Sequence, residues 1–165
     1  MNKEKQARVT KAHEEACKRR SKAIRSLAHC LGRSDVMRHH HDGLVKEMLE
    51  DAAQFTTVKK LRFHAYVCFW FTGLATVIER YQELVSKGTI PGSQKVSALL
   101  TSDFIDLLKP FRNAVAHCSD HDDERVLQLL GSPNTAPDHA AAVAMALREY
   151  FAQEEPSMCE GINAV

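Results

Sequence analysis

Apolar and polar positions follow helical spacing along the chain, and no stretch alternates with the period of two that a strand requires. Residues 3–30 are rich in Lys, Arg, Glu, Gln and Ala, with only a thin apolar stripe. Gly32 is predicted to end this helix, and Ser34 and Asp35 to cap a second helix over about 36–54. The pattern predicts an all-α protein, a helical bundle with a long N-terminal helix.

The most apolar part of the chain predicts a central helix, Val58–Val85. Its middle is hydrophobic nearly all round, which is typical of a helix at the centre of a bundle. Gly73 inside it costs about 1 kcal/mol of helix propensity, so we expect a neighbouring backbone to come close there. The longest uncharged apolar run, Ala65–Ile78, is shorter than the roughly 18–20 residues of a membrane span. We therefore predict a buried core helix and no membrane contact.

Shorter elements are predicted in the second half of the chain. Residues 87–93 are predicted as a loop, and a short helix follows around Val96. The next helix is predicted to carry a core-facing stripe with 4-3-4-3 spacing, formed by Phe104, Leu108, Phe111, Val115 and Cys118. Two last helices are predicted at about 122–130 and 138–153.

Length and composition indicate one globular domain. The chain has 165 residues, and two domains of that total length would each be short of core. We divide it into an N-terminal helical extension (1–54) packed on a helical core (55–153), with a flexible tail (154–165). Lys+Arg 22 and Asp+Glu 21 nearly balance, so no overall field attracts nucleic acid or anionic membranes. Five cysteines without CxxC spacing, and an N-terminus without an apolar leader, predict free thiols in the cytoplasm.

The strongest candidate for chemistry is the segment Arg112-Asn113-Ala114-Val115-Ala116-His117. Asn113 and His117 are four residues apart and share one helical face, and the long stem of Arg112 lets its guanidinium reach the same side. An imidazole with a pKa of about 6.5 exchanges protons near neutral pH, and a guanidinium matches phosphate geometry. Pro110, just before the segment, is predicted to kink the helix.

This segment resembles the Arg-x4-6-His motif of HEPN domains, a small all-α nucleotide-binding and ribonuclease fold. The likeness to small bacterial HEPN-type proteins covers roughly residues 55–153, through the sequences ATVIERYQEL, LLKPFRNAVAHC and DDERVLQLLG. The resemblance implies a metal-independent endoribonuclease of toxin or defence type, without a cofactor, with RNA as substrate and an antitoxin protein as partner. It implies that Arg112 stabilises the phosphorane, that His117 transfers the proton, and that Asn113 orients His117 or the scissile group.

The resemblance also implies a homodimer, because active HEPN ribonucleases pair two motifs along one cleft. Geometry favours the same arrangement, since Arg112 and His117 lie about 140° apart around a helix and enclose a site poorly in one chain. The alternative is a non-catalytic HEPN-type module that binds a nucleotide, RNA or a protein. In that case Arg112 pairs with an acid such as Glu79, and the acidic residues after His117 weigh against RNA affinity.

Metal binding has weaker support. Adjacent positions on a helix point in different directions, so His39–His41 is predicted to be a solvated segment rather than a metal tract. His13 and Cys17 are four residues apart, as are His117 and His121, and zinc can take two ligands from each of two helices. No recognised ligand spacing links these pairs, so no metal site is predicted.

Two further surfaces have an open interpretation. The basic stretch from Lys18 to Arg25 either contacts phosphates or is simply solvated, with Glu14 and Glu15 offsetting part of its charge. The aromatic cluster of the central helix is predicted to be core first and dimer interface second. It consists of Phe63, Tyr66, Phe69, Trp70 and Phe71.

Overall fold

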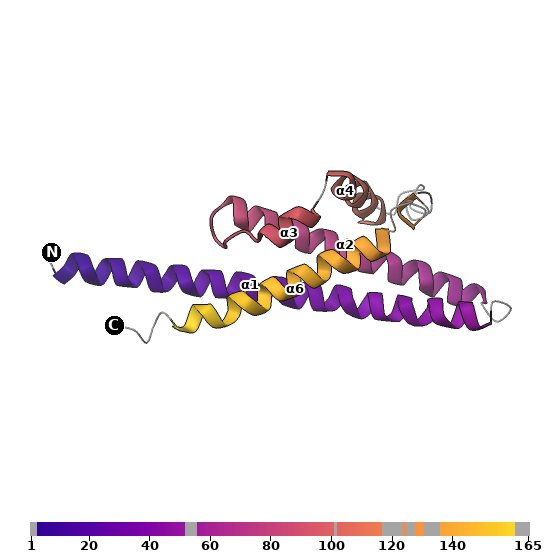
Figure 1. Ribbon diagram of the computed structural model, residues 1–165, viewed down its shortest axis with the longest axis horizontal. Coiled ribbons are helices and arrows are strands. Elements are labelled where there is room, and N and C mark those ends of the chain that lie inside the picture. Colours follow the sequence, from indigo (N-terminus) through magenta and orange to yellow (C-terminus); the bar gives the residue numbers. More distant parts are fainter. Residues whose placement is uncertain are drawn as a thin grey trace.

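The computed structural model describes residues 3–51, 56–100, 102–116, 124, 128–130 and 136–160. These residues contain helices and no strand, which confirms the all-α prediction. Helices α1 (Lys3–Glu50) and α2 (Thr57–Ser86) form a long antiparallel hairpin, and α6 (Ala136–Glu160) crosses it (Figure 1). Helix α4 (Ser102–Ala116) packs on α2, and the short helix α3 (Gln94–Leu99) packs on α6.

Helix α1 is continuous, so the predicted break at Gly32 and Ser34 is wrong. Ser34 caps nothing, because its side chain is buried and its hydroxyl donates to the carbonyl oxygen of Trp70 on α2, at 2.8 Å. Buried side chains continue through the predicted break, at Ile24, Leu27, Leu31, Ser34, His41 and Leu44. Packing of this stripe on α2 outweighs the local stop signals, because helix propensity is a weak preference that tertiary contacts override.

Helix α2 confirms the predicted central helix. Thr56 caps it, with the side-chain oxygen accepting from the amide of Lys59 at 3.4 Å. Its buried side chains repeat at three- and four-residue steps, as Val67, Trp70, Leu74, Val77, Tyr81 and Leu84. Gly73 faces Ser34, and a Cβ atom there would lie 3.5 Å from the Cα of Ser34. The expected close approach of a neighbouring backbone is therefore confirmed.

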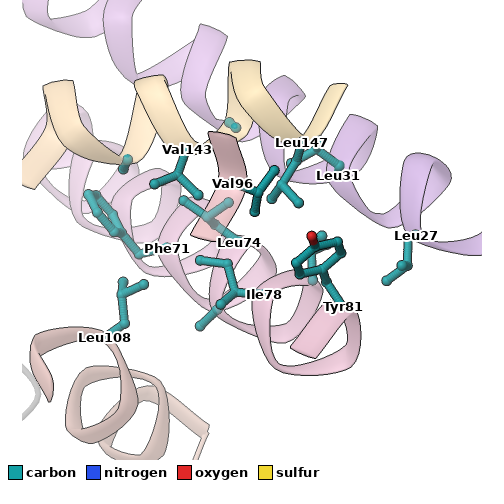
Figure 2. Close-up of a cluster of buried hydrophobic side chains, with 14 of the residues drawn as sticks. Leu27, Leu31, Phe71, Leu74, Ile78, Tyr81, Val96, Leu108, Val143 and Leu147 are labelled. Atoms are coloured by element: carbon teal, nitrogen blue, oxygen red, sulfur yellow. The ribbon is translucent and has the colours of Figure 1, made fainter. Parts of the chain in front are cut away.

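The core lies where the helices meet around the middle of α2. Figure 2 shows side chains from several helices converging there, and Leu74 and Ile78 of α2 lie near its centre. Around them lie Leu31 of α1, Val96 of α3, Leu108 of α4, and Val143 and Leu147 of α6. Full burial of such a side chain stabilises the fold by about 1.5–3 kcal/mol. Of the stripe predicted for α4, Phe104, Leu108 and Phe111 are buried and Val115 is half-buried, while Cys118 lies outside the described residues.

The loop after α2 is confirmed at residues 87–93, and two tyrosines fix it. Gly88 has a φ of 64°, a left-handed conformation that suits glycine. The hydroxyl of Tyr81 accepts from the amide of Ser93 at 2.7 Å. The hydroxyl of Tyr150 on α6 donates to the carbonyl oxygen of Pro91 at 2.6 Å. These bonds attach the loop to both α2 and α6.

Helix α6 continues to Glu160, beyond its predicted end at residue 153. At that point Glu154 forms an ion pair with Arg20 of α1. Phe151, just before it, is buried in the core. These contacts with other helices support continuation of the helix past residue 153, where the local sequence pattern predicted its end.

The N-terminal end of α1 extends past the other helices (Figure 1). Every side chain from 8 to 16 is exposed, and burial in α1 begins at Ile24. The N-terminal extension therefore packs on the bundle from about residue 17 onward, and residues 8–16 form a solvated helix.

Among the helices of the described ranges, α2 is the one long and apolar enough by composition to cross a membrane. The core helix of a soluble protein passes the same test, so length and composition alone are weak support for a span. In this fold α2 is in contact with α1, α4 and α6. That arrangement is the one expected of a core helix.

Candidate functional site

Arg112 joins α4 to α2 at the candidate site. Its Nη1 forms an ion pair with the carboxylate of Glu79, and its Nη2 donates to Oδ1 of Asn113 at 3.0 Å. Arg112 and Asn113 are two of the candidate catalytic residues predicted from the sequence, and their polar groups are in contact in the structure. The contact with Glu79 is the pairing expected for the non-catalytic alternative.

The amphipathic pattern of α4 sets the direction of these side chains. Phe111 and Ala114 are buried, whereas Asn113 and Ala116 are exposed on the other side. The helix continues unbroken through Pro110, which is exposed. The packing of its apolar stripe on α2 thus holds the motif against the hairpin and leaves the polar groups accessible.

His117 lies outside the described residues, as do Cys118 and His121. The acidic residues Asp120, Asp122 and Asp123 of the same segment are also outside them, while Glu124 is helical and exposed. The structure therefore gives the surroundings of Arg112 and Asn113, and the role of His117 stays a prediction.

A cavity of about 290 Å³ opens between α2 and α4 beside the Arg112 pair. Its walls are formed by Ala75, Ile78, Glu79, Gln82, Ile105, Leu108 and Lys109. Glu79 lines the cavity and forms the ion pair with Arg112, although Arg112 itself is not one of the lining residues. Its volume is close to the lower end of small-molecule pockets, about 300 Å³.

Sequence reasoning missed Gln82 and Lys109 as lining residues of this cavity. Gln82 comes one helical turn after Glu79, and Lys109 one turn before Arg112, so both fall on the same faces as the ion pair. That spacing is the signal that points to them. With Lys109, the site has a second cation close to the border residue Glu79.

The Arg112–Glu79 pair is partly exposed, with 28% of the arginine and 43% of the glutamate side chain accessible. An ion pair with this exposure contributes about 0–1 kcal/mol to stability. Arg112 can therefore exchange Glu79 for an incoming anion at small cost. The arrangement suits binding of a phosphate or carboxylate group by Arg112.

No group of three or more metal-ligating side chains occurs within the described part of the chain. His13 and Cys17 are in contact, with 3.7 Å between Nε2 and Sγ. The second pair considered for zinc, His117 and His121, lies outside that part. The described residues thus bring His13 and Cys17 together but assemble no zinc site of three ligands.

The histidine tract divides between solvent and core. His39 and His40 are exposed, and the ring of His40 stacks on Tyr66 with centroids 5.1 Å apart. His41 is buried, with its ring 4.9 Å from that of Phe63 and 5.4 Å from that of Trp70. The prediction of a solvated segment is therefore wrong for His41. The reason is its position, since residue 41 falls on the face of α1 that packs on α2.

The aromatic cluster of α2 is core only in part. Trp70 and Phe71 are buried, Phe63 and Tyr66 are half-buried, and Phe69 is 64% exposed. Phe69 lines a mostly apolar cavity of about 520 Å³ between α1 and α2. Cys30 and Met37 of α1 line the same cavity. A single chain therefore leaves one large aromatic side chain uncovered.

Comparisons of the chain with protein-family models, with curated proteins and with solved structures give no match. A function is accordingly inferred from the chemistry of the chain's own residues. The half-exposed Arg112, its bond to Asn113 and the neighbouring cavity are the features that bear on it.

Proposed function

We propose that this chain is a HEPN-like, metal-independent endoribonuclease of toxin or defence type. Arg112 binds the scissile phosphate, His117 transfers the proton, and Asn113 orients one of these groups. One observation supports this more than any other. The guanidinium of Arg112 is partly exposed, is paired with Glu79, which lines a cavity, and has its Nη2 3.0 Å from Oδ1 of Asn113, so it is oriented before an anion arrives.

The reaction uses groups that the motif supplies. The 2′-hydroxyl of RNA attacks the adjacent phosphorus, and the bond from phosphorus to the 5′-oxygen breaks. His117 takes the proton of the hydroxyl or gives one to the leaving oxygen, a step that contributes about 10²–10⁴-fold. Arg112 leaves Glu79 and neutralises the added negative charge of the phosphorane. No step requires a metal ion or a cofactor.

A homodimer completes the proposed site. Lys109, Asn113 and Ala116 lie along one exposed face of α4, and a two-fold axis beside this face would bring two motifs together. Ala114, also part of the motif, is buried in its own chain and does not contribute to this face. A reducing cytoplasmic location and an antitoxin protein belong to the same proposal. Light scattering tests the dimer, and we expect added phosphate to raise its thermal stability.

Cleavage in the absence of metal tests the activity. We expect the purified chain to cleave total RNA in EDTA, and the variants Arg112→Ala and His117→Ala to lose at least about 100-fold of that rate. Arg62→Ala and His29→Ala are matched controls, because both residues are exposed and far along the chain from the motif. Equal rates in the motif variants and the controls would refute the assignment.

The ion pair with Glu79 favours a second candidate, a non-catalytic HEPN-type module in which Arg112 senses a nucleotide or holds a protein partner. In this case the chain cleaves no RNA. Calorimetry with mononucleotides would then show binding to the wild type that Arg112→Ala loses and Arg62→Ala keeps.

A further inference from the structure

The positive charge of this chain is gathered in the first half of α1. Residues 3–25 contain nine Lys or Arg and three Glu, although the whole chain has a net charge of only +1. The remainder of the chain is therefore net negative. This basic segment includes the stretch that extends past the other helices, where every side chain from 8 to 16 is exposed (Figure 1).

The basic segment ends in a cavity of about 390 Å³ between α1 and the end of α2. Four cations line it, Arg19 and Lys22 from α1 and Arg80 and Lys87 from the end of α2. The hydroxyl-bearing residues Ser26 and Thr89 are in the same wall, and no acidic residue lines it. A cavity with this lining has the donors that a phosphate group requires.

Positive charge in the cavity exceeds the negative charge beside it. Arg80 and Lys87 share a single carboxylate, that of Glu83, and the Nζ of Lys87 is 2.5 Å from it. Within the described residues, Arg19 and Lys22 have no acidic partner. Two cations therefore remain available for an anionic ligand.

The cations continue along α1 away from the cavity. Arg8, Lys11, Arg19 and Lys22 fall on one face of the helix at 100° per residue, interrupted by Glu15. A row of this kind suits an extended chain of phosphates, whereas a free mononucleotide would use the cavity alone. A membrane surface is disfavoured, because an interfacial helix needs large apolar side chains opposite its cations and Val9 is the one such residue from 8 to 16.

We propose that this cationic row and the cavity bind the phosphates of a single RNA strand, with Arg19 and Lys22 as the main contacts. The choice of RNA rests on the proposed function, but the surface itself is separate from Arg112. Its test measures binding rather than cleavage. Cleavage of RNA without binding that depends on Arg19 and Lys22 would mean that this inference fails. Such binding without cleavage would mean that the proposed function fails.

Fluorescence anisotropy with a labelled oligouridine in EDTA is the test, in a His117→Ala background that prevents cleavage. We expect Arg19→Glu/Lys22→Glu to raise the Kd at least about tenfold and to lower the slope of log K against log salt by about 0.7 per cation removed. Lys46→Glu/Lys60→Glu is the matched control, with the same charge change on exposed residues at the other end of the hairpin. We expect its Kd to stay much closer to that of the parent. If the glutamate pair unfolds the chain, Arg19→Gln/Lys22→Gln gives the same readout with a smaller effect.

Three results would overturn the inference. The first is an equal Kd for the test pair and the control pair. The second is competition by ATP at the concentration of the RNA itself, which identifies a mononucleotide site. The third is binding to phosphatidylserine vesicles that depends on Arg19 and Lys22 when oligouridine does not bind, which identifies a membrane surface.

Discussion

A Cβ atom placed on Gly73 would lie 3.1 Å from the Cβ of Ser34. The two long helices approach each other closely at this point, because one contributes a glycine and the other a small serine. The Ser34 hydroxyl donates to the carbonyl oxygen of Trp70, one turn before Gly73 on α2. Small side chains and a buried hydrogen bond thus hold the hairpin together at its middle.

A larger side chain at Gly73 should therefore weaken the hairpin. We expect Gly73→Val to lower the free energy of unfolding by about 1–3 kcal/mol, because its methyl groups would overlap Ser34 and force the helices apart. Urea denaturation followed by circular dichroism measures the change.

Gly32 is the matched control for that experiment. It lies in the middle of α1, and a Cβ there would meet nothing within 4 Å. Gly32→Ala should stabilise the chain by about 0.5–1 kcal/mol through helix propensity alone. A Gly73→Val variant as stable as the wild type would contradict the close contact between the helices.

Arg148 of α6 holds α1 through a bidentate contact with Asp35. Its Nε is 2.7 Å and its Nη2 is 2.6 Å from the two carboxylate oxygens, and this contact raises the pKa of Arg148. Lysine cannot form the paired bonds, so Arg148→Lys should cost up to about 1 kcal/mol despite the retained charge. Chemical denaturation measures it, and a double-mutant cycle with Asp35→Asn assigns the loss to this pair. A coupling of zero would show that solvent screens the contact completely.

Two buried tyrosines, Tyr81 and Tyr150, should make the stability of the fold decrease at high pH. Burial raises the pKa of Tyr81 and of Tyr150 above 10, and the charge of Glu154 adds to it in both. Because the folded pKa is raised, this contribution to stability is complete below about pH 10 and is lost as the pH rises through the folded values. The Tyr66→Phe variant removes the third tyrosine of the chain, so that its phenolate absorbance at 295 nm reports on Tyr81 and Tyr150 alone. As the pH is raised, this absorbance should increase together with the loss of the helical circular dichroism signal. Ionisation at pH 10 in a chain that is still folded would contradict it.

Glu79 competes with any anion for Arg112. Removing its charge in Glu79→Gln frees the guanidinium, so we expect up to about fivefold tighter binding of phosphate or RNA, the equivalent of about 1 kcal/mol. Isothermal calorimetry with inorganic phosphate measures this effect. Glu47→Gln is a suitable control, because it also removes a partly exposed carboxylate from an ion pair, at the far end of the hairpin. Weaker binding in Glu79→Gln would show that Glu79 orients Arg112 instead of competing with the ligand.

The candidate site was accessible to sequence reasoning only in part. The spacing of Arg112 and Asn113 in a helical pattern placed both polar groups beside a core-facing stripe, and Glu79 was named as a partner for Arg112. The cavity beside them could not be predicted, because Gln82 and Lys109 belong to two helices whose mutual rotation is set by packing. The cavity lined by Arg19, Lys22, Arg80 and Lys87 was hidden for the same reason, since its cations lie up to 68 positions apart along the chain.

The sequence by itself determined that the protein is all-α and that α2 is its central helix, because a 3.6-residue apolar pattern is a local property of the chain. The loop at 87–93 and the core stripe of α4 followed from the same kind of signal. Only the tertiary structure decided that α1 runs unbroken past Gly32 and Ser34, that His41 is buried, and that α6 reaches Glu160. In the first two cases a contact with a distant helix outweighs a weak local preference, and in α6 contacts at Phe151 and Glu154 carry the helix past residue 153. The free energy of burying a side chain against a distant helix exceeds the fraction of a kcal/mol by which most local signals differ.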